Sequence, residues 1–347
     1  MSILAWLVLS GCVPHASSQA WANSSLVLVT QQKKALLLSG LDLAAQPPRL
    51  TPLAKLPIPA GANVVSQSTV IAQGKQRFAV FVETPSASKP YSATVFDVVL
   101  TRRTVTSLGN MNDGVQPEIA AGSLSALGSL PGHAEISKIV WYRFPSLTPQ
   151  KSAPLSFSFE GRDASCLVGE KQQKGAVWVT LQRIQGTQLG AQTQITTESA
   201  PSGLACTEQG ALVALSGRYP SGQRIQAKQL LPDNRVAILY NGQPIRFVQV
   251  GDSPQNVAWI DAHLAVTDVE TGPKRTLVFF DPLLGQVTHR TPLENMQSLT
   301  ALSVVADKVI AVGDHELAIV SSAGKELARL QLPGNSDTYD LRSHVPE

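Results

Sequence analysis

The sequence predicts an all-β fold, and three observations support this prediction. The 23 Pro and 25 Gly residues are spread along the whole chain, which suits many short strands separated by turns and argues against long helices. The apolar runs are short and rich in Val, Leu and Ala, and several are apolar throughout, as strands buried on both faces are. A turn-linked pair of such runs also recurs along the chain, which indicates that one structural unit is used repeatedly.

The recurring unit is a pair of strands that starts at a small or polar residue and is followed by a third strand, a turn and a polar-faced last strand. The units are spaced by about 35 to 60 residues, as four-stranded propeller blades are. A single blade cannot bury both faces, so blades must stack around an axis. We therefore predict a β-propeller of seven four-stranded blades, with six or eight as alternatives because residues 110–132 are irregular. Copies begin at Asn63, Ser165, Leu204, Asn256 and Leu302, and a weaker copy ends at Ile139–Tyr142.

The two ends of the repeat array predict how the ring closes. The last unit contains four candidate strands, whereas the first unit, Ser24–Pro57, contains only three. We therefore expect Asp337–Arg342 to return and supply the missing strand of the first blade, which removes open sheet edges. The alternative is a frayed C-terminal tail. The candidate strands of the last unit are Leu302–Ala306, Lys308–Gly313, Glu316–Ser321 and Leu327–Leu332.

The repeat unit resembles the loose family of quinoprotein-like and YVTN-type propellers, most clearly in Asp281–Val287 and Asn256–Asp268. Asp268–Gly272 matches a fragment of the Trp-docking signature of quinoprotein enzymes, and a turn explains this fragment equally well. The full signature is absent, as is the Gly-His…Trp-Asp pattern of WD40 blades. The resemblance therefore implies an architecture and no particular activity.

The N-terminus carries a separate signal. A short apolar stretch, Ile3–Val8, precedes Leu9-Ser10-Gly11-Cys12, and a polar, small-residue stretch follows. This arrangement resembles the lipobox of bacterial lipoprotein precursors, although no Lys or Arg precedes Cys12. The resemblance implies a signal peptide over residues 1–11, acylation of Cys12 with palmitate among its chains, a lipidated tether over 12–23 and a single propeller domain over 24–347. The alternative is a buried N-terminal strand with an incidental Cys.

Lipidation of Cys12 would leave Cys166 and Cys206, an even number in an oxidising compartment. These two residues lie about one repeat apart. They also occupy nearly equivalent positions at the start of consecutive units, where neighbouring blades come close. We predict a structural disulfide between them, with two buried, unpaired thiols as the alternative. Val13 follows Cys12 in place of Asp, and the lipobox resemblance then implies the outer membrane, with the chain facing the periplasm.

No residue pattern predicts a catalytic residue, a cofactor or a metal ligand. The net charge is +3, charged residues make up 15% of the chain, and no block of like charges occurs, which argues against nucleic-acid binding. No two of the six His residues have zinc-type spacing, and there is no Gly-x-Ser-x-Gly elbow, although Ser, His and Asp could converge from distant positions. We expect His263 and His315 to be solvated turn residues, and Asp97, Asp268 and Asp281 to bond their own backbone in turns.

The tryptophans divide into two groups. Trp141, Trp178 and Trp259 lie in or beside predicted strands, so we expect them to pack in the core instead of forming a sugar or cofactor platform. Trp21 lies outside the repeats, where packing on the first blade and anchoring a partner are equally open.

These observations favour a protein-interaction scaffold: a lipid-anchored propeller that docks other proteins of a bacterial envelope assembly, of the outer-membrane biogenesis, secretion or conjugation type. The propeller lipoprotein of the outer-membrane barrel-assembly machine is the nearest analogy, in architecture only. The alternative is an enzyme or small-ligand binder that uses the central channel. It predicts polar side chains converging at one mouth of the ring, from the segments expected before inner strands: Gly161–Ser165, Glu198–Gly203 and Gly251–Gln255.

Overall fold

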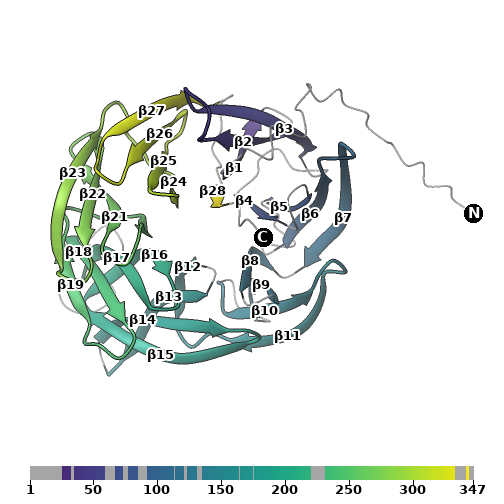
Figure 1. Ribbon diagram of the computed structural model, residues 1–347. Helices are drawn as coiled ribbons and strands as arrows, with labels where there is room; N and C mark the ends of the chain where they lie inside the picture. The colour runs from purple at the N-terminus through teal and green to yellow at the C-terminus, as the bar shows by residue number, and fades with distance from the viewer. Residues whose placement is uncertain are drawn as a thin grey trace, which may run out of the picture.

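The computed structural model describes residues 26–32, 35–58, 67–72, 77–84, 92–112, 114–120, 123–130, 135–163, 165–174, 176–219, 231–332 and 341–343. These residues contain 28 strands and no helix. The strands form seven antiparallel sheets of four strands each, arranged as blades around a central axis (Figure 1). The predicted all-β, seven-bladed propeller is therefore confirmed.

The blades are numbered in chain order, and each is given from its inner to its outer strand. Blade 1 contains β28 (Leu341–Ser343), β1 (Leu26–Gln32), β2 (Ala35–Asp42) and β3 (Arg49–Pro57). Blade 2 contains β4 (Gln67–Ala72), β5 (Arg77–Glu83), β6 (Ser92–Val99) and β7 (Thr104–Asn112). Blade 3 contains β8 (Val115–Ala120), β9 (Ser123–Gly128), β10 (Lys138–Arg143) and β11 (Thr148–Pro154).

The remaining blades follow the same order. Blade 4 contains β12 (Ser158–Asp163), β13 (Cys166–Gln173), β14 (Ala176–Gln185) and β15 (Gln188–Thr197). Blade 5 contains β16 (Ser199–Cys206), β17 (Gly210–Arg218), β18 (Leu231–Tyr240) and β19 (Arg246–Gln249). Blade 6 contains β20 (Val257–Trp259), β21 (Ala265–Thr271), β22 (Lys274–Asp281) and β23 (Gln286–Leu293). Blade 7 contains β24 (Ala301–Val305), β25 (Lys308–Val312), β26 (Glu316–Ser321) and β27 (Glu326–Gln331).

The ring is closed by its C-terminal strand, as predicted. In six blades the strands run outward in chain order, but in blade 1 the innermost strand is β28, which pairs antiparallel with β1 through Leu341 opposite Leu28 and Ser343 opposite Leu26. Figure 1 shows β28 beside the opening of the ring, between β24 and β4. The strand begins at Leu341, whereas the prediction began at Asp337, and residues 337–340 lie outside the described residues.

Within the segment that was irregular in sequence, β8 and β9 form the two inner strands of blade 3. Pairing between β8 and β9 changes register between Val115 and Glu118, at the position of Gln116 and Pro117. Proline cannot donate a hydrogen bond to the ladder, so the regular pairing is interrupted at Pro117. The weaker copy that ends at Ile139–Tyr142 is β10, the third strand of the same blade.

The core is divided among the seven blade interfaces. Each of the seven apolar clusters combines residues of two neighbouring blades, including one between blades 7 and 1 that holds Leu28 and Ile310 together. In β17, Ala211 and Val213 face blade 4, whereas Leu212 and Ala214 belong to the cluster shared with blade 6. A strand that is buried on both faces must be apolar throughout, which is why the inner runs do not alternate.

Carboxylates join neighbouring blades beside these clusters. Glu83 Oε1 of blade 2 accepts a hydrogen bond from the Gln116 backbone N–H of blade 3 at 2.6 Å. Asp163 Oδ2 of blade 4 accepts one from the Cys206 backbone N–H of blade 5 at 2.5 Å. Each bond satisfies a backbone donor of an inner strand and fixes the position of the next blade.

Cys166 and Cys206 form a disulfide with a Cα–Cα distance of 6.3 Å, as predicted. The prediction that both cysteines occupy nearly equivalent positions at the start of consecutive repeat units is wrong in detail. Cys166 begins β13, the second strand of blade 4, whereas Cys206 ends β16, the inner strand of blade 5. The two residues therefore flank the corresponding turns of neighbouring blades from opposite sides, and the bond spans the interface between the blades.

The N-terminal predictions lie outside the described residues. These include the signal peptide, Cys12, Val13, the tether and Trp21. Within the ranges that the structure describes, no helix is sufficiently long and apolar to cross a membrane.

Candidate binding site between blades 5 and 6

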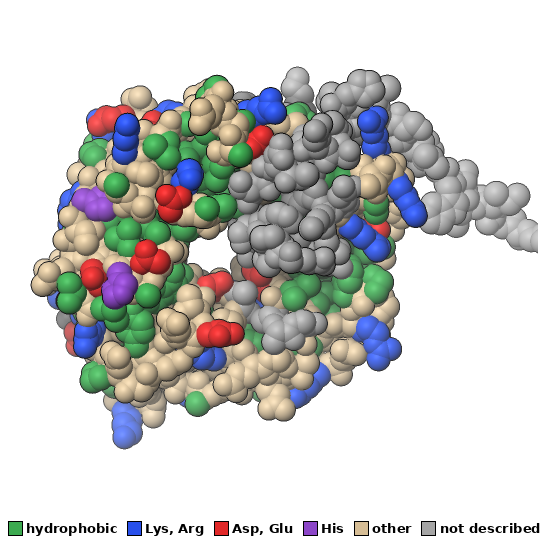
Figure 2. All heavy atoms as spheres, viewed as in Figure 1, with side chains coloured by type: hydrophobic (Ala, Val, Ile, Leu, Met, Phe, Trp, Pro, Cys, Tyr) green, Lys and Arg blue, Asp and Glu red, His purple; other side chains and the backbone are tan. Residues whose placement is uncertain are grey.

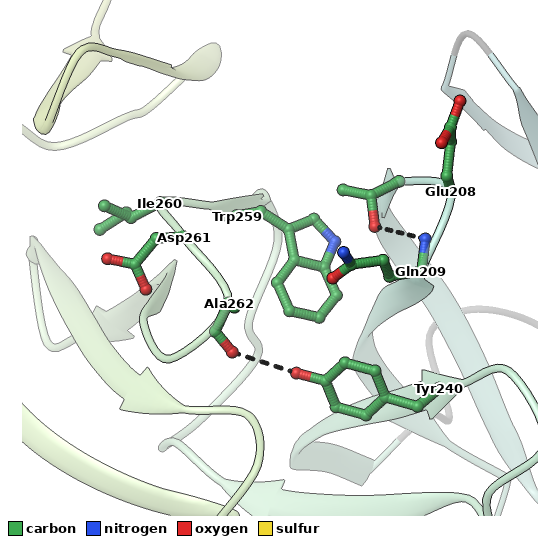
Figure 3. A pocket seen from close by; sticks show the side chains of 8 residues that line it. Glu208, Gln209, Tyr240, Trp259, Ile260, Asp261 and Ala262 are labelled. Carbon is green, nitrogen blue, oxygen red and sulfur yellow. Dashed lines mark hydrogen bonds between the residues drawn. The ribbon is translucent and has the colours of Figure 1, made fainter.

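A hollow of about 350 Å³ lies where blades 5 and 6 meet (Figure 3). Three chain segments supply its walls: the turn between β16 and β17, the end of β18, and the end of β20 with the turn that follows. The lining residues are Thr207, Glu208, Gln209, Tyr240, Trp259, Ile260, Asp261 and Ala262.

The first turn is held by its own threonine and by a neighbouring arginine. Thr207 Oγ1 accepts hydrogen bonds from the backbone N–H groups of Gln209 and Gly210 at 3.3 and 3.2 Å. Arg183 Nη1 donates to the Thr207 carbonyl oxygen at 2.8 Å. A Cβ atom at Gly210 would lie 2.4 Å from the Leu239 carbonyl oxygen, so glycine is required where this turn enters β17. The backbone of the turn is thus fixed while the Glu208 side chain remains exposed.

The second turn is held by an aspartate. Asp261 Oδ1 accepts a hydrogen bond from the His263 backbone N–H at 2.7 Å, and the N–H groups of Ile260 and Asp261 donate to the Leu264 carbonyl oxygen at 2.9 and 3.0 Å. Short polar side chains commonly stabilise turns in this way. His263 is exposed here and His315 is exposed in the turn between β25 and β26, so the prediction of solvated turn histidines is confirmed.

An aromatic pair forms the wall between the two turns. The ring centroids of Tyr240 and Trp259 lie 5.8 Å apart at an interplanar angle of 61°. Trp259 Nε1 donates to the Ala205 carbonyl oxygen at 3.2 Å, and the Tyr240 hydroxyl donates to the Ala262 carbonyl oxygen at 3.3 Å. Both polar groups are therefore occupied, and the rings are held in place. Burial raises the pKa of Tyr240, the charge of Asp281 raises it further, and Arg246 opposes this shift, so the phenol stays protonated at neutral pH.

The arrangement combines an aromatic surface with carboxylates. Figure 3 shows Gln209 beside the Trp259 indole, with Glu208 and Asp261 on opposite sides of it. Both carboxylates are exposed, and none of the eight lining residues is Lys or Arg. Such a site favours cations, which are attracted to the faces of aromatic rings and to negative charge.

Exposed apolar side chains lie toward the outer edge of the same two blades. Phe247 in β19 is 38% exposed, and Leu284 in the turn between β22 and β23 is 68% exposed. The Arg246 guanidinium donates to the Leu283 carbonyl oxygen and so ties β19 to this turn. Asp281 Oδ1 closes this turn by accepting hydrogen bonds from the backbone N–H groups of Leu283 and Leu284 at 2.7 and 3.0 Å. The predicted turn role of Asp281 is therefore confirmed.

Asp268 does not lie in a turn, contrary to the prediction. It is fully buried in β21, where Oδ1 accepts the Asn256 backbone N–H at 2.7 Å and Oδ2 lies 3.4 Å from Arg275 Nη1. Burial raises the pKa of Asp268, whereas the bonds from Asn256 and the charge of Arg275 lower it. Asp97 also differs from the prediction, because its carboxylate pairs with Arg77 across β5 and β6 at 2.8 Å. The sequence could not show either pairing, since both partners come from other strands.

A buried serine and aspartate meet in blade 5. Ser199 Oγ donates to Asp233 Oδ2 at 2.8 Å, and Arg235 Nη2 donates to the same oxygen at 2.8 Å. The bond links the start of the inner strand to β18 and involves no histidine. Across the ranges that the structure describes, no three His, Cys, Asp or Glu side chains gather as metal ligands do.

The segments proposed for one mouth of the channel do not all lie there. Gly251–Gln255 precedes β20 as expected, but Gly161–Ser165 ends β12 and turns into β13, at the opposite end of an inner strand. Glu198–Gly203 largely belongs to β16 itself. Figure 2 shows the central opening, with carboxylates nearer to it than most Lys and Arg side chains on that face.

The tryptophans agree with the prediction only in part. Trp141 is 1% exposed, and its Nε1 donates to the Gly186 carbonyl oxygen at 3.0 Å, so it is a core residue. Trp178 is half-buried in β14. Trp259 packs against the cluster between blades 5 and 6 and also lines the hollow. Sequence reasoning missed the hollow because Tyr240 and Trp259 belong to different blades.

Comparisons with known proteins agree on the fold. No family model matches the chain, and no curated protein matches it. Among solved structures, a functionally unknown protein from Desulfotomaculum acetoxidans DSM 771 is similar with a TM-score of 0.58 and 12% identity, over 93% of this chain and all (100%) of that one. Hsv2 from Kluyveromyces lactis has a TM-score of 0.56 and 10% identity, over 90% of this chain and 97% of that one. Apo AztD from Citrobacter koseri has a TM-score of 0.51 and 10% identity, over 91% of this chain and 97% of that one. At these identities the likeness shows the fold alone.

Proposed function

We propose that the protein is an interaction scaffold: a propeller, lipid-anchored through Cys12 and facing the periplasm, that docks other proteins of a bacterial envelope assembly. One observation supports the proposal that this protein docks other proteins. The aromatic and acidic hollow between blades 5 and 6 lies near exposed Phe247 and Leu284, which gives one face of two blades a recognisable contact surface. Aromatic side chains are enriched where proteins bind one another.

The compartment is supported by the cysteines. A disulfide between Cys166 and Cys206 suits an oxidising compartment such as the periplasm. Under this proposal the remaining cysteine, Cys12, carries lipid, and several acyl chains hold a protein at a membrane stably, whereas one chain does not. The residues that follow Cys12 would tether the ring near the membrane surface.

Site-specific photocrosslinking in native membranes tests the docking role. A photoreactive amino acid at Leu284 should give one dominant crosslink to an envelope protein, in stoichiometric amounts. The matched control is Leu231, which is 45% exposed at the end of β18 opposite to Tyr240 and should give no such product. A monomer that yields no crosslink at Leu284 and purifies with a bound small molecule would contradict the scaffold and favour the channel-ligand alternative.

The lipid anchor is tested separately with Cys12→Ala. The variant should leave the membrane fraction and lose the mass of the acyl chains. Unchanged fractionation and mass would show that the lipobox interpretation is wrong, whatever the outcome of the crosslinking.

A further inference from the structure

We propose that the hollow between blades 5 and 6 binds the side chain of an arginine presented by a partner protein. This inference rests on the scaffold function proposed above, and it specifies the chemistry that the partner offers. Three properties of the hollow support it: a fixed aromatic surface, two carboxylates that form no ion pair with a Lys or Arg side chain of the described residues, and a size suited to one side chain.

The aromatic surface is fixed before any partner binds. Trp259 is held through its Nε1 bond to the Ala205 carbonyl oxygen, and Tyr240 through its hydroxyl bond to the Ala262 carbonyl oxygen. Because both rings are already ordered, binding a partner costs little side-chain conformational entropy on this side of the interface. A guanidinium can stack on the face of an indole and interact with its electron-rich surface.

The charge of the hollow favours a cation. Glu208 and Asp261 present exposed carboxylates on either side of Trp259 (Figure 3). Among the described residues, no side chain donates a hydrogen bond to the Glu208 carboxylate, and Asp261 accepts its only one from the His263 backbone. The nearby Arg183 and Arg246 each donate to a backbone carbonyl oxygen, of Thr207 and Leu283 respectively.

Size and shape favour arginine. A hollow of about 350 Å³ is at the lower end of the range for ligand pockets, which suits one long side chain. Arginine combines a planar group that stacks on aromatic rings with donors that match a carboxylate, whereas the lysine ammonium is a strongly hydrated point charge. Phe247 and Leu284 then offer apolar contact for the residues that flank the arginine in the partner.

Fluorine NMR of the full chain labelled with 5-fluorotryptophan tests the inference. The chain has five Trp residues, and the Trp259 resonance is assigned by its loss in Trp259→Phe. The probe is N-acetyl-arginine amide, and N-acetyl-citrulline amide is the neutral control of nearly the same shape. We expect a saturable shift of the Trp259 resonance with the arginine probe, a weaker one with N-acetyl-lysine amide and none with the citrulline probe.

Charge variants identify the residues responsible. Glu208→Gln and Asp261→Asn should each weaken binding of the arginine probe by about two- to five-fold. Asp252→Asn is the matched control, because Asp252 is an exposed carboxylate near the opposite end of β20 and its loss should leave the titration unchanged. Both site residues are exposed in turns, and thermal unfolding of each variant confirms that the ring remains folded.

The result separates this inference from the scaffold function. An equal shift with the citrulline probe, or no selective shift at Trp259, would overturn the arginine site. If crosslinking at Leu284 nevertheless persists in Glu208→Gln, the scaffold stands and its partner is recognised by other chemistry. If the arginine probe binds as expected but no partner crosslinks, the arginine site stands as a ligand site and the scaffold fails.

Discussion

The Tyr219 hydroxyl donates a hydrogen bond of 2.6 Å to Glu170 Oε1, and both side chains are buried at the interface between blades 4 and 5. Glu170 lies on β13, the same strand that carries Cys166 of the disulfide. One strand of blade 4 is therefore linked to blade 5 twice, once by a covalent bond and once by a charge-assisted hydrogen bond.

Removing the hydroxyl in Tyr219→Phe should destabilise the protein by about 1 to 3 kcal/mol, because the buried Glu170 carboxylate loses a donor. Urea unfolding followed by fluorescence measures this change. Tyr240→Phe is the control, since Tyr240 is only partly buried and donates to a carbonyl oxygen at the surface. Equal effects of the two substitutions would contradict the importance of the buried bond.

Loss of the disulfide in the double variant Cys166→Ala/Cys206→Ala should lower the free energy of unfolding by about 2 to 4 kcal/mol. The seven apolar clusters remain, so the circular dichroism spectrum at low urea should not change. Reducing agent should lower the stability of the wild-type protein and leave that of the double variant unaltered. Sensitivity to reductant in the double variant would contradict this interpretation.

Asp268→Ala should destabilise the protein by about 3 to 5 kcal/mol, because it leaves the buried Arg275 guanidinium without its close counter-ion. It also removes the acceptor that holds the Asn256 N–H at the start of β20. Asp97→Ala, which removes a pair at the surface, is the control and should change the urea midpoint little. A small effect at Asp268 would mean that the surroundings of Arg275 compensate.

The stability of the protein should fall as the pH decreases below about 6.5. Burial lowers the pKa of His289, which stacks on Phe279 with ring centroids 4.2 Å apart, and the Ser322 backbone opposes this shift only in part. Between the folded and unfolded pKa values, the unfolded chain binds a proton that the folded chain does not. His289→Phe should reduce the loss of stability between about pH 7.5 and pH 5.5, measured by urea unfolding. An unchanged pH dependence in His289→Phe would contradict this explanation.

Deleting residues 333–347 should open the ring, because β28 supplies the inner strand of blade 1. The exposed edge of β1 would then be free to pair with other chains. Size-exclusion chromatography should show aggregation, and thermal unfolding should begin at a lower temperature. A synthetic peptide of residues 337–347 should reverse both effects in part. A monomeric truncated chain of unchanged stability would show that closure does not need β28.

The sequence was most informative where structure depends on local pattern. The apolar runs of Val309–Val312 and Leu212–Leu215 identified strands buried on both faces, and counting strands in the last unit predicted the closing role of the C-terminus. It was least informative where partners come from different strands. The pairing of Asp268 with Arg275 depends on register across β21 and β22, and local turn chemistry gave the wrong prediction there.

The candidate site could not be predicted for a related reason. Trp259 and Tyr240 meet only because blades 5 and 6 pack side by side, and neither residue has a neighbour in sequence that signals a pocket. Thr207 and Asp261 stabilise their own turns locally, but the position of Glu208 beside an aromatic wall depends on the angle between two blades.

The position of β28 gives the molecule a built-in order of assembly. The ribosome synthesises β28 after every other described strand. Strand β1 therefore lacks its inner neighbour while the following six blades fold. The cluster shared by blades 7 and 1, with Leu28 and Ile310, likewise has to wait for blade 7, the last blade to be made. The nascent ring therefore stays open until its last strand is made, and folding is completed by a single event that joins β28 to β1.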